Sequence, residues 1–273
     1  PEEFPLFAGS AVIDYLGAAG TVRAVEGLLA AVANHADESY MRLGRTFDLA
    51  SINADQTPTF QAQMAWSAEE GYDHVIVEAR TVGQENWTTL PELSGQTTSA
   101  IPLDCEQGFY IGLHPNLSKY LTPGDPCTTP GSAIPGEWHA FTGESGGWVP
   151  VAFDLSAYAN QQVEIIISYV TDPVTGGAGV AIDDTRLTFN GGADVVDAEG
   201  FEGGLGAWLV LGPPEGSADN PRDWEVAEQL GDITAGVATE DSLLLGFGIE
   251  QLESPDARAE LVGDALALLG GSG

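Results

Sequence analysis

The stretch GESGGWVPVAFDLSAYANQQVEIIISYVTDPVTGGAGVAIDDTRL, residues 143–187, decides the fold class. Apolar residues alternate through 149–155, and residues 162–170 are rich in β-branched types and long enough to cross a sheet. Residues 179–187 follow as a third segment, which carries the acidic pair Asp183-Asp184. Alternation with period two between Gly, Pro, Asn and Asp punctuation is the pattern of strands and turns.

The same pattern recurs upstream, at residues 39–49, 59–67, 72–81 and 87–90. In the third of these segments, alternation predicts two faces, one with Val75, Val77 and Ala79 and the other with His74, Ile76 and Glu78. These strands together predict a mainly β protein, an antiparallel β-sandwich over residues 39–192.

Residues 94–142 form a long insertion that is rich in proline. It contains the two cysteines of the chain, Cys105 and Cys127. Their spacing is not that of a metal site, so we predict a disulfide, which would contribute about 3 kcal/mol and indicates an oxidising compartment. The alternative is two unrelated buried thiols. The aromatic residues of the insertion could line a groove, but a small satellite core is the favoured interpretation for Phe109, Tyr110, Tyr120, Trp138 and Phe141.

The two ends differ in character from the sandwich. Residues 1–38 are predicted to be a lead-in segment, and residues 193–227 a linker or wrapping segment. Residues 228–273 predict a strand–helix tail of an α/β unit, with Ser254 as N-cap and Pro255 at the first helical position. A lone strand and helix cannot bury their own apolar face, so we expect a neighbouring α/β domain.

The charge balance limits the kinds of partner that the protein can bind. Eight Lys and Arg residues stand against 41 Asp and Glu residues, a net charge of −33 among 273 residues, and Lys119 is the only lysine. Such a chain repels itself unless salt screens the repulsion, so we predict a high-salt habitat; the alternative is an ordinary acidic secreted protein. Nucleic acid is a poor partner because there is no basic patch. No apolar run spans a bilayer, and no signal peptide is apparent.

Several motifs resemble one known family. They are Gly146-Gly147-Trp148, Asp154-Leu155-Ser156-Ala157-Tyr158, Tyr169-Val170-Thr171-Asp172 and Ile182-Asp183-Asp184. In this order they resemble the jelly-roll accessory region C-terminal to the catalytic domain of secreted bacterial zinc carboxypeptidases and immune inhibitor A-type metallopeptidases. The resemblance implies a jelly-roll fold and a non-catalytic docking or stabilising role. It also implies secretion and a parent peptidase or neighbouring α/β domain as partner.

The chain itself offers no convincing catalytic site. His35 and Glu38 have the HxxE spacing of a zinc carboxypeptidase, and His139 lies downstream, but short motifs match by chance and we reject this one. We therefore expect no zinc in this chain. The GxSxG spacing at residues 143–147 is interpreted as a turn between strands, because a nucleophile elbow needs a following helix.

Calcium is the metal that the resemblance implies, as a structural ion near the acidic pair. The candidate ligands are Asp73, Asp183, Asp184 and Glu202, with Asp172 a remote fifth. The alternative is a solvated acidic face, which is common in so acidic a protein.

Two other functions remain open. A carbohydrate- or glycoprotein-binding module would need exposed aromatic residues, for which the candidates are Trp87, Trp138 and Trp148. A structural subunit of a cell-surface layer or filament would need contacts between copies. In each case we expect the protein to be secreted or at the cell surface, with a peptide, a glycan or a surface polymer as partner.

Overall fold

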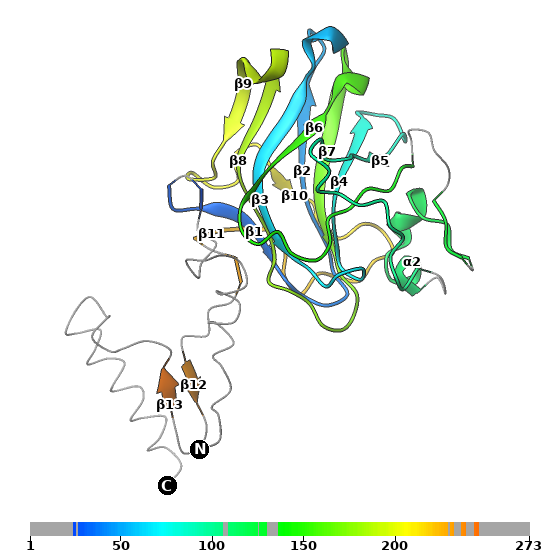
Figure 1. Cartoon of the computed structure of the whole chain (residues 1–273), viewed down its shortest axis with the longest axis vertical. Helices are drawn as coiled ribbons and strands as arrows, with labels where there is room; N and C mark the ends of the chain where they lie inside the picture. Colours follow the sequence, from blue (N-terminus) through cyan, green and yellow to red (C-terminus); the bar gives the residue numbers. More distant parts are fainter. Residues whose placement is uncertain are drawn as a thin grey trace, which may run out of the picture.

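The structure is a computed structural model that describes residues 24–25, 27–105, 109–124, 126–129, 136–228, 230–231, 236–238 and 243–245. The expected C-terminal helix with Ser254 and Pro255, and most of the lead-in segment, lie outside these residues. Within the described residues the protein is mainly β, as the alternation predicted (Figure 1).

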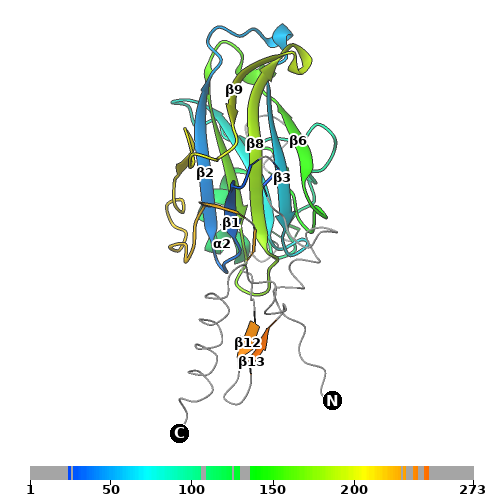
Figure 2. The same ribbon diagram turned by 90° about the vertical axis from the view of Figure 1, so that its left-hand side faces the viewer.

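The described strands form two large antiparallel sheets that face one another, as Figure 2 shows edge-on. The first sheet has the order β11 (Glu225–Ala227), β1 (Ala30–Asn34), β8 (Gly179–Phe189), β3 (Thr59–Ser67), β6 (Val149–Asp154), and β9 (Asp194–Glu199) also pairs with β8. The second sheet has the order β10 (Leu209–Val210), β2 (Tyr40–Asp48), β7 (Gln162–Val170), β4 (His74–Thr81), β5 (Thr88–Thr89). A separate pair joins β12 (Gly236–Ala238) to β13 (Leu243–Leu245).

The connectivity is that of a jelly roll. Strand β1 pairs with β8, β2 with β7, β3 with β6 and β4 with β5, all antiparallel. These are the pairings of one long hairpin folded across two sheets, which is the eight-stranded jelly-roll arrangement. Strands β9, β10 and β11 follow in sequence and extend both sheets.

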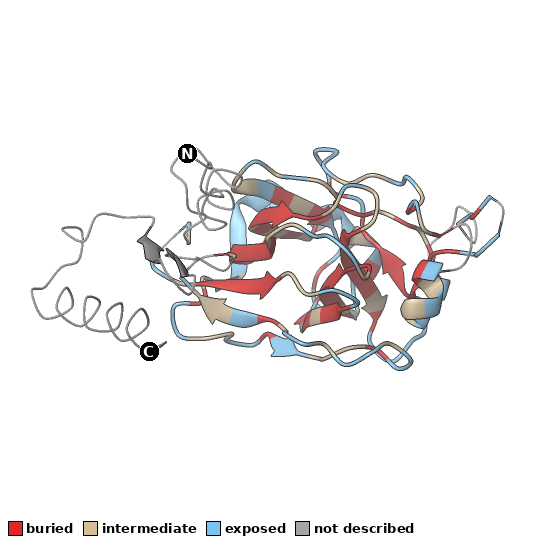
Figure 3. Cartoon of the chain, turned by 90° about the horizontal axis from the view of Figure 1, so that it is seen from below, coloured by how far each residue is buried: buried red, intermediate tan, exposed pale blue. Residues whose placement is uncertain are grey.

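The sandwich core confirms the predicted faces. Val75, Val77 and Ala79 of β4 lie in the main apolar cluster between the sheets. Ile76, from the opposite face of the same strand, belongs to a second cluster. Strand β7 is buried at nearly every position because both of its faces are covered. Figure 3 shows this band of buried strands within an exposed rim of turns.

The insertion covers the outer face of the second sheet. Its short helices α2 (Phe109–Leu113) and η2 (Pro115–Lys119) are separated only by His114. The second apolar cluster combines insertion residues with residues of the sheet: Tyr40, Ile76, Trp87, Cys105, Tyr110, Leu117, Tyr120, Leu121, Cys127, Trp138, Ala140, Ile166 and Val170. The satellite core is thus confirmed, with two differences: Phe141 packs in the main core and Phe109 is exposed.

Candidate functional site

Three turns meet at one end of the sandwich and bring carboxylates together. Leu103 N–H donates to the carbonyl of Gly71 at 2.9 Å, which joins the insertion to the turn between β3 and β4. Asp172 N–H donates to Asp73 Oδ1 at 3.0 Å, which joins that turn to the segment after β7. Burial raises the pKa of Asp73 to about 7. We call this junction of Asp73, Asp104 and Asp172 the acidic junction.

Asp104 is the unusual member of the acidic junction. Both of its carboxylate oxygens are buried, and neither accepts a hydrogen bond from another residue that the structure describes. Burial, followed by the charges of Asp172 and Glu69, raises the pKa of Asp104 to about 7. Asp104 could not be singled out from the sequence, because the insertion that carries it shows no periodicity from which burial could be inferred.

His35 lies beside the acidic junction and has no free ring nitrogen. Its Nδ1 is 2.9 Å from the Tyr169 hydroxyl, and its Nε2 is 3.1 Å from Asp37 Oδ1. Glu38 donates its backbone N–H to the carbonyl of Asp172. His139 contacts Glu137 instead, with its Nε2 3.3 Å from the carboxylate. These partners are those of structural side chains, and no three His, Cys, Asp or Glu residues in the described part of the chain form a group that could hold a metal.

Two of the calcium candidates hold the segment before β1. Val25 N–H donates to Asp183 Oδ2 at 2.7 Å, and Leu28 and Leu29 N–H both donate to Glu202 Oε1 at 2.8 Å. Asp183 and Glu202 are therefore brought to the same short segment, where Asp183 Oδ1 also accepts a hydrogen bond from Asp184 N–H at 2.7 Å.

The other two candidates lie elsewhere. Asp184 has φ 48° and accepts a hydrogen bond from Arg186 Nε at 2.7 Å. Asp73 belongs to the acidic junction, whereas Asp183 pairs with Gln63 further along the sheet. The four candidates do not converge on one point, and calcium binding stays a prediction.

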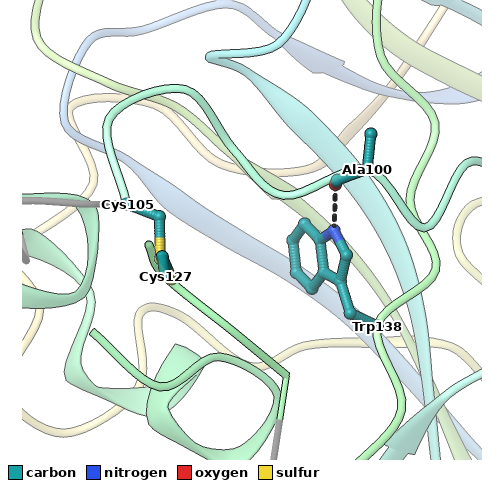
Figure 4. The surroundings of a disulfide bond; sticks show 4 residues. All are labelled: Ala100, Cys105, Cys127 and Trp138. Carbon is teal, nitrogen blue, oxygen red and sulfur yellow. Dashed lines mark hydrogen bonds between the residues drawn. A yellow bond between two sulfur atoms is a disulfide. The ribbon is translucent and has the colours of Figure 1, made fainter. Parts of the chain in front are cut away.

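The tryptophans are held within the protein. Trp138 is 2% exposed and donates its indole N–H to the carbonyl of Ala100 at 2.9 Å, close to the disulfide (Figure 4). Trp87 is 8% exposed, with Arg80 and Lys119 over its ring. Trp87 and Trp138 are therefore not the exposed aromatic residues that a carbohydrate-binding module would need, because both are buried in the second apolar cluster beneath the insertion. Trp148 is partly buried against small residues on the outer face of the first sheet.

The predicted disulfide and the predicted turn are both present. Cys105 and Cys127 are bonded and close the insertion onto itself. Ser145 lies in a bend before β6, where its hydroxyl accepts a hydrogen bond from Trp66 N–H at 3.0 Å and donates to the Trp66 carbonyl at 3.1 Å. This serine extends the edge of β3, and no helix follows it.

Comparisons with known proteins give a local similarity. No known family profile matches the chain. A stretch of 62 residues is 45% identical to part of the pre-pro-metalloprotease PrtV of Vibrio cholerae serotype O1, in strains M66-2 and ATCC 39315. The match covers 22% of this chain and 7% of the Vibrio protein, so it spans a small part of that protein's length. This chain therefore contains a region similar to part of a metalloprotease.

No helix in the described ranges is long and apolar enough to cross a membrane.

Proposed function

We propose that this chain is a non-catalytic accessory region of a secreted zinc carboxypeptidase-like exoprotein, which docks substrate or surface and stabilises the parent enzyme. The observation that carries the proposal is the 45% identity over 62 residues to a metalloprotease, in a chain whose described residues hold no group for a metal. The disulfide supports an oxidising, extracellular setting.

The chemistry of the histidines supports a non-catalytic role. A catalytic zinc needs three protein ligands and an open position for water. His35 is occupied by Tyr169 and Asp37, and His74 is buried, with its pKa lowered to about 3 by that burial. His114 Nε2 lies 2.8 Å from the carbonyl of Thr171 and so donates to it. Each of these rings has a structural partner or lies away from solvent, so the described part of the chain offers no open histidine cluster.

The test is the intact mass and zinc content of the protein purified from its native source. We expect a mass several times 28.5 kDa with about one zinc per molecule. The matched control is residues 1–273 expressed alone, which should bind no zinc and cleave no peptide. A native protein near 28.5 kDa without zinc would overturn the proposal.

A further inference from the structure

Strand β9 is an edge strand whose outer side pairs with no strand in the part of the chain that the structure describes. Strand β8 pairs with β3 on one side, and with β1 and then β9 on the other. The far side of β9 therefore faces outward, on the side of the sandwich that Figure 2 turns toward the viewer. Backbone N–H and C=O groups on such an edge are free to pair with another strand.

The centre of this edge is apolar and exposed. Val195 is 52% exposed and Val196 is 55% exposed. The edge strand of the second sheet on the same side, β10, adds Leu209, which is 64% exposed. Arg45 of β2 joins the two edges, because it binds Asp197 of β9 and its strand also pairs with β10. Exposed apolar side chains along a free strand edge are typical of a surface that another chain covers.

The chain itself covers the outer edges of other long strands. On β2, Leu211 N–H donates to the carbonyl of Arg42 at 3.0 Å. The side chain of Asn220 accepts a hydrogen bond from Tyr40 N–H at 2.9 Å and donates one to the Tyr40 carbonyl at 3.1 Å. On β6, Leu93 N–H donates to a carbonyl of the strand at 2.9 Å. Among the described residues, only β8 makes hydrogen bonds to the main chain of β9, so its outer edge has no comparable cover.

The three acidic side chains of β9 each have a partner within their own chain. Asp197 Oδ2 lies 2.5 Å from Arg45 Nη2. Asp194 accepts a hydrogen bond from the side-chain amide of Asn190 at 2.7 Å. Glu199 accepts one from the backbone N–H two residues later at 3.0 Å. These contacts offset part of the negative charge of the strand, so the edge repels a second acidic strand less than its sequence suggests.

We propose that β9 pairs antiparallel with β9 of a second copy of this chain, about a twofold axis at Val196. In this register Val196 faces its own counterpart, Val195 faces Asp197, and Asp194 faces Ala198, so no carboxylate lies opposite another. A shift of one residue in either direction would set Asp194 opposite Asp197 or opposite the glutamate that ends the strand. Like charges directly opposite one another destabilise a strand pair, so the charge pattern selects this register and a closed dimer.

The contact should be weak and should depend on salt. A bulge against β8 falls at Val196, and bulges weaken pairing at an edge. Each copy also carries a net charge of −33, which opposes association until salt screens it; at 1 M the Debye length is about 3 Å. The proposal goes beyond the accessory role and stands without it, because it rests on the edge of β9 alone.

The test is the molar mass of the full chain in solution, measured by light scattering after size-exclusion chromatography at increasing NaCl. We expect 28.5 kDa at low salt, and a value approaching twice that mass in molar NaCl at high protein concentration. Val196→Asp sets two carboxylates face to face at the axis and should raise the dissociation constant of the dimer by about tenfold. The matched control is Leu93→Asp, the same change at a side chain that is 60% exposed beside β6, which should dimerise as the parent does.

A second measurement tests the register directly. Residues directly opposite in an antiparallel pair have Cα atoms about 4.5–5.5 Å apart, which a disulfide can bridge. Mild oxidation in molar NaCl should therefore give a covalent dimer for Val196→Cys and none for Leu93→Cys, since the two native cysteines are bonded to each other. A chain that stays monomeric at every salt concentration would overturn the proposal. So would a dimer that Val196→Asp does not weaken, or one that Val196→Cys does not cross-link. None of these results affects the zinc content or the intact chain mass that test the accessory role.

Discussion

Replacing Glu78 by glutamine should destabilise the protein strongly, because its carboxylate organises the layer between the insertion and the second sheet. Glu78 is 2% exposed. Its Oε1 accepts hydrogen bonds from the hydroxyls of Tyr120 at 2.7 Å and Tyr40 at 3.2 Å, and from Asn116 Nδ2 at 3.4 Å. Its Oε2 accepts one from the Ser168 hydroxyl at 2.5 Å. One carboxylate thus joins β2, β4, β7 and the insertion.

The magnitude follows from the donors that glutamine cannot satisfy. Glu78→Gln keeps the size of the side chain but turns one oxygen into an NH₂ group, which faces a hydroxyl or amide that was donating to it. Loss of a charge-assisted hydrogen bond costs about 1.5–3 kcal/mol, and a buried donor left without a partner adds about 1–3 kcal/mol. We expect a loss of about 3 kcal/mol in the free energy of unfolding. Tyr120→Phe should cost about 1–2 kcal/mol.

The assay is urea unfolding at constant NaCl, followed by tryptophan fluorescence, for a double-mutant cycle of Glu78→Gln and Tyr120→Phe. Because both substitutions remove the same hydrogen bond, the double variant should be about 1 kcal/mol more stable than the sum of the two single losses in the free energy of unfolding predicts. The control is Glu85→Gln, an exposed carboxylate paired with Arg80, which should change stability by less than about 0.5 kcal/mol. A Glu78→Gln variant as stable as the parent would refute the reasoning, and would mean that burial of the charge cancels its hydrogen bonds.

Four further predictions concern charge, cross-linking and ions. Asp104→Asn should raise the free energy of unfolding by about 1–2 kcal/mol at pH 8, where the unfolded carboxyl is ionised and burial of its charge opposes folding; the gain should shrink as the pH falls from the folded pKa of about 7 toward the ordinary value of about 4, below which both states hold the proton, and equal effects at pH 8 and pH 4 would contradict this. Joint replacement of Cys105 and Cys127 by serine should lower the free energy of unfolding by about 3 kcal/mol for a loop of separation 22, measured by urea unfolding against the reduced parent, which should match the variant. The melting temperature should rise steadily from 0.1 to 2 M NaCl, since screening reduces the repulsion of a −33 chain, and a flat curve would count against the high-salt prediction. Calorimetric titration with calcium in high salt should give a binding heat that Glu202→Gln reduces, and a flat titration of the parent would count against calcium.

The strands could be predicted from sequence because alternation reports directly which side chains share a face. Val75 and Val77 had to be buried together once the segment was read as a strand, and the structure places both in the main core. The satellite core was also predictable, since the apolar content of the insertion exceeded what an exposed loop can carry. The pairing of distant strands was not predictable from alternation alone, because it depends on which edges meet.

What covers the second face of a strand could not be predicted in the same way. Alternation placed Glu78 opposite Val77, but it could not show that the insertion folds over that face and turns an apparently exposed carboxylate into a buried one. The same covering layer buries Trp87 and Trp138. A one-residue bulge in the pairing of β3 with β8 lies beside Asp183 and Asp184, so the two carboxylates have different partners. Two consecutive aspartates in a sequence do not reveal such a change of register.

Other parts of the protein cover the outer faces of the two sheets to different extents, and this difference indicates where a docking partner can bind. The second sheet is covered by the insertion, whose residues lie in the second apolar cluster. On the first sheet, Val32 and Ala65 both lie opposite Ala181 on the outer face, and all three are buried in a third cluster with Leu230. Along β3, however, the outer face changes from Ala65 to the partly buried polar Gln63 and Gln61. That half of the first sheet keeps polar side chains partly exposed to solvent, and Gln61 and Gln63 belong to none of the apolar clusters of the described residues, so a docking partner would find an uncovered sheet face there.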